Sequence, residues 1–431
     1  MAAAEASAKR DGARTPWRLV ITLTLVVAGA VVSLVLVAAG AESGNVNAKA
    51  DQWQISYWKK PIPAQGRAPE NYLKQARGLL PENCGACHAA QYEDWKQSIH
   101  SKAMGPGVAG QFLTMEFSGQ AACLKCHAPM TEQWGGLRGD DGQWRANSAF
   151  NAQLQSRGMV CSACHLRGHK RHGPPLPPGK TPVSQAVHGE PFRTEFFRAS
   201  EFCKGCHQHP ASSMIINGKT VENTYREWLD TPYPGQGKSC QSCHMPGGRH
   251  LWKGIHDPGM TRAGVSISTS LSNEQPKVGE EIEARLTLTN TGTGHAFPTY
   301  PTPAVYLKAA FLDKAGAVVP GNFHKEKIIQ RSLDMSVYPW GEKFDTRVLP
   351  GESVSLNFRR RVPAAAASLY LWVWVEPDNF YTGFYRSFLK RGKDFPGAEQ
   401  LSQALQNSLD SQYLLFSRTV PIEQPVGRGS H

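Results

Sequence analysis

The sequence has no cysteine outside five short motifs. All ten cysteines fall in pentads of the form C-x-x-C-H, so none remains for a disulfide or a separate redox dithiol. Disulfide scaffolds have no reason to repeat one two-residue gap, and zinc ribbons use such knuckles in pairs, which would leave one pentad over. Both classes are therefore excluded for the set. The pentads, numbered 1 to 5 below, are Cys84–His88, Cys123–His127, Cys161–His165, Cys203–His207 and Cys240–His244.

A C-x-x-C-H pentad is typical of the covalent attachment of c-type haem. The two thiols bond to the haem vinyl groups, and the histidine reaches one axial face of the iron. The sequence therefore predicts five covalently attached haem c groups, in a compartment outside the bacterial cytoplasm. The predicted attachment residues are Cys84, Cys87, Cys123, Cys126, Cys161, Cys164, Cys203, Cys206, Cys240 and Cys243, with His88, His127, His165, His207 and His244 as proximal iron ligands.

The apolar run Leu19–Ala41 has no charged residue and is rich in valine, leucine and alanine. About 20 such residues span a bilayer. Four basic residues precede the run, so the positive-inside rule predicts a cytoplasmic segment at 1–18, a single-pass inner-membrane anchor at 19–41 and a periplasmic remainder. A signal peptide cleaved after Ala41 is the alternative, although the run exceeds the roughly 7–15 residues of a signal h-region. No second apolar run of this kind follows.

The formal net charge is +12. An exported haem protein rarely meets nucleic acid, so we expect no nucleic-acid partner. Each haem also brings two propionates, and we expect basic residues to pair with them. The alternative is that positive charge steers the chain toward an acidic redox partner or an anionic membrane face.

Spacing suggests how the chain is organised. Residues 42–80 are expected to form a proline-containing tether along the haem domain or near the membrane surface. Residues 81–260 hold all five pentads, whose first cysteines are 39, 38, 42 and 37 residues apart. So few residues per haem cannot build an ordinary apolar core, and the haems themselves must supply it. We predict a mainly α-helical and irregular cytochrome c domain, with short helices ending at each pentad.

From residue 261 apolar and polar residues alternate, which indicates half-buried strands. Strands are expected around 265–271, 282–288, 305–312, 354–358 and 369–375, with turns at 313–316 and 349–352. The pattern predicts that 261–431 is an all-β, immunoglobulin-like sandwich with a late helix at 397–412. The last five residues are expected to be a mobile tail.

The opposite face of each iron needs a second ligand, and ten other histidines are available. Histidine there gives a low-potential haem, whereas methionine raises the potential. Met104, Met130 and Met245 are the methionine alternatives, although core packing is their commoner role. His209 lies two residues after His207, so its short tether favours a neighbouring haem over its own. The other candidates from the haem segment are His100, His188, His250 and His256, of which at least one of the last two is expected to ligate.

His295 stands apart because it lies in the expected β-domain, in the glycine-rich sequence Asn290–Pro298. Such a loop permits close approach to another surface. We hypothesise that His295 caps a haem iron and couples the two domains. The alternative, given equal weight, is a histidine hydrogen-bonded within its own turn.

Four stretches resemble the multihaem cytochrome c-554 family: Trp95–His100, Cys123–Pro129, Ser200–Gln208, and Trp228 ahead of Cys240–Pro246. The resemblance covers roughly residues 81–260. It implies closely stacked haem pairs, mostly with two histidine ligands, and distal ligands near His100, His188 and His250 or His256. The haem arrangement of that family is similar to that of hydroxylamine-oxidising and nitrite-reducing enzymes. This chain has no C-x-x-C-K site, so it departs from the pentahaem nitrite reductases.

These observations favour a membrane-anchored electron-transfer cytochrome that links a quinol-linked or soluble donor to a partner redox protein. A second hypothesis is an oxidoreductase acting on a small nitrogen or sulfur compound at one open-faced haem, which leaves enzyme status undecided. A third, compatible with the first, is a subunit whose β-domain docks a larger respiratory or photosynthetic complex.

Overall fold

The computed structural model describes residues 56–179, 185–321, 325–336, 338–390, 392 and 394–424. Residues 58–431 form one compact unit, and only residues 56 and 57 of the preceding unit are described. The predicted cytoplasmic segment, anchor and C-terminal tail lie outside these ranges. Across the described residues, no helix combines the length and apolarity needed to cross a membrane.

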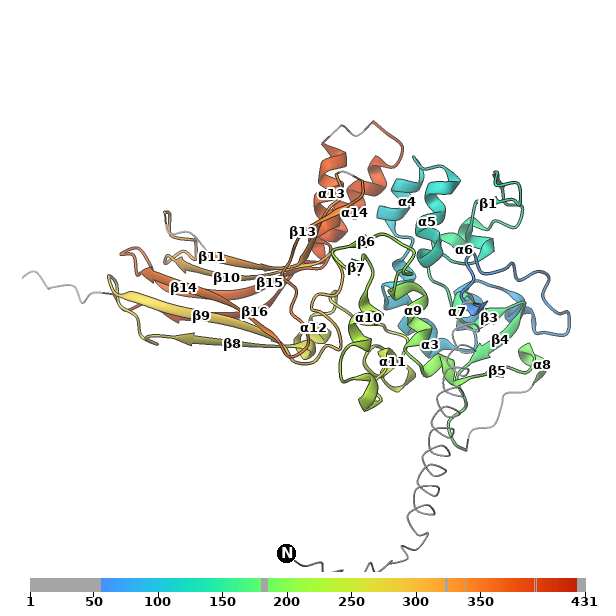
Figure 1. Cartoon of the computed structure of the whole chain (residues 1–431), viewed down its shortest axis with the longest axis horizontal. Coiled ribbons are helices and arrows are strands. Elements are labelled where there is room, and N and C mark those ends of the chain that lie inside the picture. Colours follow the sequence, from blue (N-terminus) through green and yellow to red (C-terminus); the bar gives the residue numbers. More distant parts are fainter. Residues whose placement is uncertain are drawn as a thin grey trace, which may run out of the picture. The chain divides into compact units, whose positions relative to one another are not determined.

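The cysteine-bearing part consists of short helices and small hairpins (Figure 1). Its helices are α2 (Pro81–Gly85), α3 (Ala89–Gln97), α4 (Pro106–Phe112), α5 (Phe117–His127), α6 (Ala152–Ser156), α7 (Cys161–His165), α8 (Gln185–His188), α9 (Glu201–His207), α10 (Thr224–Leu229), α11 (Cys240–His244) and α12 (Pro258–Gly264). Its strands are β1 (Gly136–Arg138), β2 (Trp144–Ala146), β3 (Leu166–Arg167), β4 (Lys170–Gly173), β5 (Phe192–Arg193), β6 (Ile215–Ile216) and β7 (Lys219–Thr220). Four of the five pentads end a helix, as predicted, whereas pentad 1 begins in the last turn of α2 and ends directly before α3.

The second part is rich in β-structure. Its strands are β8 (Val265–Leu271), β9 (Glu281–Asn290), β10 (Ala304–Leu312), β11 (Lys325–Ile329), β12 (Arg331–Asp334), β13 (Gly341–Asp345), β14 (Ser353–Arg361), β15 (Ser368–Glu376) and β16 (Tyr413–Pro421). Helices α13 (Asn379–Leu389) and α14 (Ala398–Asp410) separate the last two strands. The predicted helix at 397–412 is thus present. The expectation of an otherwise all-β segment was wrong, because α13 has an amphipathic aromatic pattern that was not recognised.

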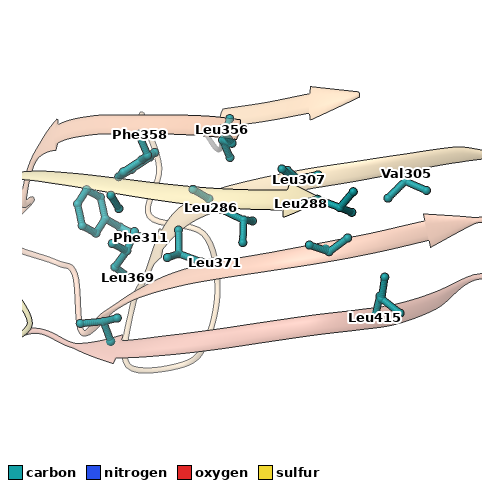
Figure 2. Packing of buried hydrophobic residues seen from close by; sticks show 14 of the residues in the cluster. Leu286, Leu288, Val305, Leu307, Phe311, Leu356, Phe358, Leu369, Leu371 and Leu415 are labelled. Carbon is teal, nitrogen blue, oxygen red and sulfur yellow. The ribbon is translucent and has the colours of Figure 1, made fainter. Parts of the chain in front are cut away.

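Two antiparallel sheets form the centre of this part. One has the strand order β11-β10-β15-β16 and the other β14-β9-β8. Alternate residues of β9 and β15 are buried, and they meet between the sheets in one apolar core (Figure 2). Leu286, Leu307 and Leu371 come from three different strands, and none is more than 1% exposed. The five predicted strands are confirmed within a few residues of their expected bounds; the immunoglobulin-like topology stays a prediction.

The cysteine-bearing part has no comparable apolar core. Between Leu166 and Val265, Ile216 is the one buried hydrophobic residue among those described. A small apolar cluster that includes Leu124 and Trp134 packs near pentad 2. This scarcity fits the expectation that bound macrocycles, rather than side chains, fill the interior of this region.

Helix α4 packs closely against α14, which ties the neighbourhood of pentad 2 to the C-terminal part. A side chain at Gly107 would collide with the Tyr385 hydroxyl, and one at Gly110 would come within 2.9 Å of Gln400. Gly397 precedes α14 with a φ of +94°, and its Cα lies against the backbone of Gly110. The two glycines of α4 therefore allow a contact that larger residues would prevent.

Arg347 connects the β-rich part to helix α10. Its guanidinium donates to Glu227 (2.8 Å), to both oxygens of Asp345 (2.9 Å each) and to the carbonyl of Thr299 (2.7 Å). Its side chain is only 3% exposed. Glu227 in turn accepts a hydrogen bond from the backbone amide of Ala296 at 3.2 Å. This buried network therefore holds the loop that contains His295.

Replacing Arg347 with methionine is expected to destabilise the protein by about 3–5 kcal/mol, because it removes the cation paired with buried Glu227 and one of the two cations paired with Asp345. Thermal or denaturant unfolding of the haem-loaded protein measures this. Arg359→Met is a matched control, since Arg359 pairs with Glu281 at the surface, where both side chains are more than half exposed. Little change is expected there. Equal losses in both variants would contradict a special role for Arg347.

The same network predicts acid sensitivity. Burial alone would raise the pKa of Asp345, but hydrogen bonds from Arg347 and Lys219 and their charges outweigh burial and hold this pKa well below its usual value. A lowered folded-state pKa gives stability that is fully present above about pH 4 and is lost as the pH falls through the folded-state value.

Candidate haem-binding site

The side chains of different pentads lie close together. Cys84 of pentad 1 contacts Cys161 of pentad 3. Cys126 of pentad 2 contacts Cys206 of pentad 4. All ten cysteines are free of disulfides, as covalent haem attachment requires.

Pentad 4 has the most neighbours among the five. Besides pentad 2, it meets pentad 5 through the contact of Cys203 with Cys240. Cys164 of pentad 3 lies within electrostatic range of both cysteines of pentad 4. Pentad 1 therefore neighbours pentad 3, and pentad 3 neighbours pentad 4. Pentads 2 and 5 each contact pentad 4 as well.

Three proximal histidines each face another histidine ring. The ring centroids of His207 and His100 are 6.3 Å apart, and those of His165 and His250 are also 6.3 Å apart. The second sequence part provides the third partner, because His244 and His295 are 6.4 Å apart with ring planes only 12° from parallel.

This separation has a simple geometric meaning. A histidine nitrogen binds a metal ion at about 2.0 Å, and the ring centroid lies about 1.15 Å behind it, so rings on opposite sides of one iron have centroids about 6.3 Å apart. The three measured separations agree with that value. Direct ring stacking would bring the centroids closer. These residues therefore fit one six-coordinate iron per pair.

Hydrogen bonds orient the rings for such ligation. Nδ1 of His165 donates to the carbonyl of His172 at 2.8 Å, and Nδ1 of His244 donates to the carbonyl of Lys253 at 2.7 Å. Histidine ligands of metals characteristically donate their other ring N–H in this way. On the facing side, Nδ1 of His250 and of His295 bond the carbonyls of Gly248 and Ala296, both at 2.9 Å. In each ring Nε2 is thus left for the iron.

Burial favours the neutral form of three ligand candidates, His100, His165 and His207. It is the largest cause that lowers the pKa of His100 to about 3, and the pKa values of His165 and His207 to about 4. A neutral imidazole can donate a lone pair to iron, whereas an imidazolium cannot.

The remaining predicted ligands have different surroundings. His188 lies close enough to His88 that its charge lowers the pKa of His88, although burial of His88 is the larger cause. Nε2 of His256 bonds Asp378 at 3.0 Å, so of the two histidines after pentad 5 only His250 faces a proximal ligand. Among the described residues, no histidine ring is paired with His127 at the separation seen in the three facing pairs.

Pentad 2 instead has acidic and phenolic neighbours. Burial is the main cause that raises the pKa of Glu222 to about 7; the charges of Cys126 and Glu227 raise it too, and Arg331 lowers it. The Cys126 contribution vanishes once the thiol becomes a thioether, but burial remains. His209 lies near this group, since its amide donates to the carbonyl of Glu222 at 2.8 Å. Tyr381 of α13 is within electrostatic range of Cys123 and Glu222.

Several residues that hold the ligands were missed from the sequence. Asp94 accepts two hydrogen bonds from Arg249 (2.6 and 2.7 Å) and one from the amide of His250 (2.9 Å). The Arg249 bonds lower the pKa of Asp94 to about 2. The clamp thus fixes the backbone that carries His250. Asp94 is 155 residues from Arg249, so no local pattern could reveal it.

Two aromatic residues were also missed. The Trp252 ring packs edge-on against both His100 (4.6 Å) and His250 (5.1 Å), which face the histidines of pentads 4 and 3. Tyr300, from the loop after His295, places its hydroxyl 2.5 Å from Nδ1 of His207. Two of the three methionine alternatives fit packing better, since Met104 and Met130 are buried and Met130 accepts a hydrogen bond from Ser162.

Comparison with known proteins agrees with this geometry. Residues 83–166 match the model of the cytochrome c554 and c-prime family. The structure is similar to that of a penta-heme cytochrome c552 from Thermochromatium tepidum, with a TM-score of 0.56 and 20% identity over 81% of this chain and all of that chain. AvmM, which catalyses macrocyclisation in alchivemycin A biosynthesis, matches at 14% identity over 26% of this chain and 74% of that chain, with a TM-score of 0.18. Spo0M of Bacillus subtilis matches at 12% identity over 26% of this chain and 42% of that chain, with a TM-score of 0.12. Neither match supports an argument about this chain. Residues 83–166 are therefore similar to the cytochrome c554 and c-prime family, and the chain shares its fold with a penta-heme cytochrome.

Proposed function

We propose that the chain carries five haem c groups, one on each pentad, and that four irons have two histidine ligands. The three facing ring pairs give His100 with His207, His250 with His165, and His295 with His244. His188 is assigned opposite His88 from their electrostatic proximity. His256 is left out because it pairs with Asp378.

We further propose that the chain is a membrane-anchored periplasmic cytochrome that transfers electrons between a quinol-linked or soluble donor and a partner redox protein. Bound haem c supplies an iron that takes up and releases one electron at a time. Each facing histidine pair would hold one iron and would keep substrates away from it. The neighbouring pentads join the five sites into one branched series. The observation that carries the proposal is the recurrence of the 6.3–6.4 Å histidine separation at three pentads.

Anaerobic rapid mixing tests this function. The fully reduced holoprotein is mixed with a soluble high-potential c-type cytochrome, and separately with nitrite, hydroxylamine or sulfite. We expect fast reoxidation of all five haems by the cytochrome and little reaction with the small molecules. Preferential, multiple-turnover reaction with one small molecule would contradict an electron-transfer role and support an oxidoreductase.

Pentad 2 gives the enzymatic alternative specific support. An open iron opposite His127 would lie in the neighbourhood of Glu222, whose raised pKa allows it to donate or accept a proton near neutral pH. His209 is the competing occupant of that axial position. The two outcomes differ in one observable, because cyanide or nitric oxide binds an open iron at once and displaces a histidine ligand slowly.

A further inference from the structure

The segment before the pentads places a positive charge between two haem attachment sites. Nζ of Lys60 lies 3.2 Å from Sγ of Cys206 in pentad 4 and 3.7 Å from Sγ of Cys126 in pentad 2. It donates a hydrogen bond to the carbonyl of Gly205 at 2.5 Å. The ammonium is partly buried and has no carboxylate partner among the ion pairs of the described residues.

The surrounding contacts hold Lys60 firmly in this position. Ile62 is fully buried, its amide donates to Pro129, and its carbonyl accepts from the amide and the hydroxyl of Thr131. These partners directly follow pentad 2. On the other side, the Trp58 ring packs edge-on against Phe202 at 5.1 Å and covers Gly205, where an added Cβ would lie 2.9 Å from the indole. Residues 58–62 are thus built into the region between pentads 2 and 4.

We propose that Lys60 stabilises the reduced state of the haems on pentads 2 and 4 and so makes these two haems the first of the series to be reduced. The inference rests on the proposed attachment of haem at both pentads. Reduction adds one negative charge to a haem, and a nearby fixed cation favours that step.

The expected effect is large enough to measure. A unit charge about 10 Å from an iron changes the reduction equilibrium roughly tenfold at an effective dielectric constant of about 20. Tenfold corresponds to about 59 mV for a one-electron couple. Because Lys60 lies against one cysteine of each pentad, both haems should respond, whereas the haem on the more distant pentad 1 should not.

The test is a potentiometric titration of the full holoprotein, with the five haems resolved by their EPR or visible spectra. Lys60→Gln is expected to lower two of the five reduction potentials. Each shift should correspond to a roughly tenfold change in the reduction equilibrium of that haem. Lys60→Leu serves as the second neutral variant should the glutamine variant not load all five haems. Lys60→Arg keeps the charge and is expected to restore most of the shift.

Lys59→Gln is the matched control, because Lys59 is adjacent in sequence but exposed. Unchanged potentials in the neutral variants would overturn the proposal, as would equal shifts of all five haems. A third outcome would also overturn the proposal: the potentials rise in Lys60→Arg and do not fall in Lys60→Gln. That result would show that Lys60 is uncharged in the parent protein. The titration requires no partner, so failure of electron transfer to a partner leaves this result interpretable.

Discussion

His295→Ala is expected to convert one haem from a low-spin to a high-spin iron, although residue 295 lies 51 positions beyond its partner His244. The two rings face each other at 6.4 Å, and Nδ1 of His295 is held by the carbonyl of Ala296. Removal of the ring opens one axial position of the pentad 5 iron and raises its potential, because a strong nitrogen donor to Fe(III) is lost. The difference spectrum between variant and parent measures the change directly.

The control for this experiment is His256→Ala. His256 is also a histidine near the end of the haem segment, but it bonds Asp378 rather than facing a proximal ligand. We expect its haem spectrum to match that of the parent. An unchanged spectrum for His295→Ala would show that His295 is only hydrogen-bonded within its own loop.

Loss of the haem on pentad 4 should have the widest consequences. The double variant Cys203→Ser, Cys206→Ser removes the attachment site that contacts pentads 2 and 5 and lies within electrostatic range of pentad 3. It is expected to lose one haem and to divide the remaining four into groups that no longer exchange electrons rapidly. The cost in stability should exceed about 5 kcal/mol, because a group larger than any side chain leaves a region with almost no apolar core of its own.

Pentad 1 supplies the matched variant, since its cysteines contact only pentad 3. Cys84→Ser with Cys87→Ser should also lose one haem, but the other four should still equilibrate in a single fast phase after partial reduction by a light pulse. Haem content and the time course of the absorbance changes measure both variants. Equal behaviour of the two variants would contradict the central position of pentad 4.

Several β-strands could be predicted from the sequence, and the five pentads could be recognised in it, because both depend on local patterns; haem attachment at each pentad stays a prediction. The C-x-x-C-H pentads carry their chemistry in five consecutive residues, and alternation identifies β9 and β15 within a few positions. The close approach expected of the glycine-rich loop is also present: a Cβ at Gly292 would collide with the carbonyl of Ala263.

The residues that escaped prediction act over long sequence distances. Lys60, Asp94 and Tyr300 each meet their partners at least 66 positions away, and none lies in a motif. Residues 58–62 were expected to form part of a tether along the haem domain or near the membrane surface, and they pack between two pentads. Their placement depends on the three-dimensional arrangement of the pentads, which spacing alone does not specify.

An EPR-monitored redox titration of the purified full-length holoprotein tests the account most directly. It predicts five haems per chain, each accepting one electron reversibly, with four low-spin signals of bis-histidine irons from pentads 1, 3, 4 and 5. The EPR signal of the pentad 2 iron should be the one that differs from these four or that changes when cyanide is added. Fewer than five haems, or high-spin irons at pentads where histidine rings face each other, would contradict it.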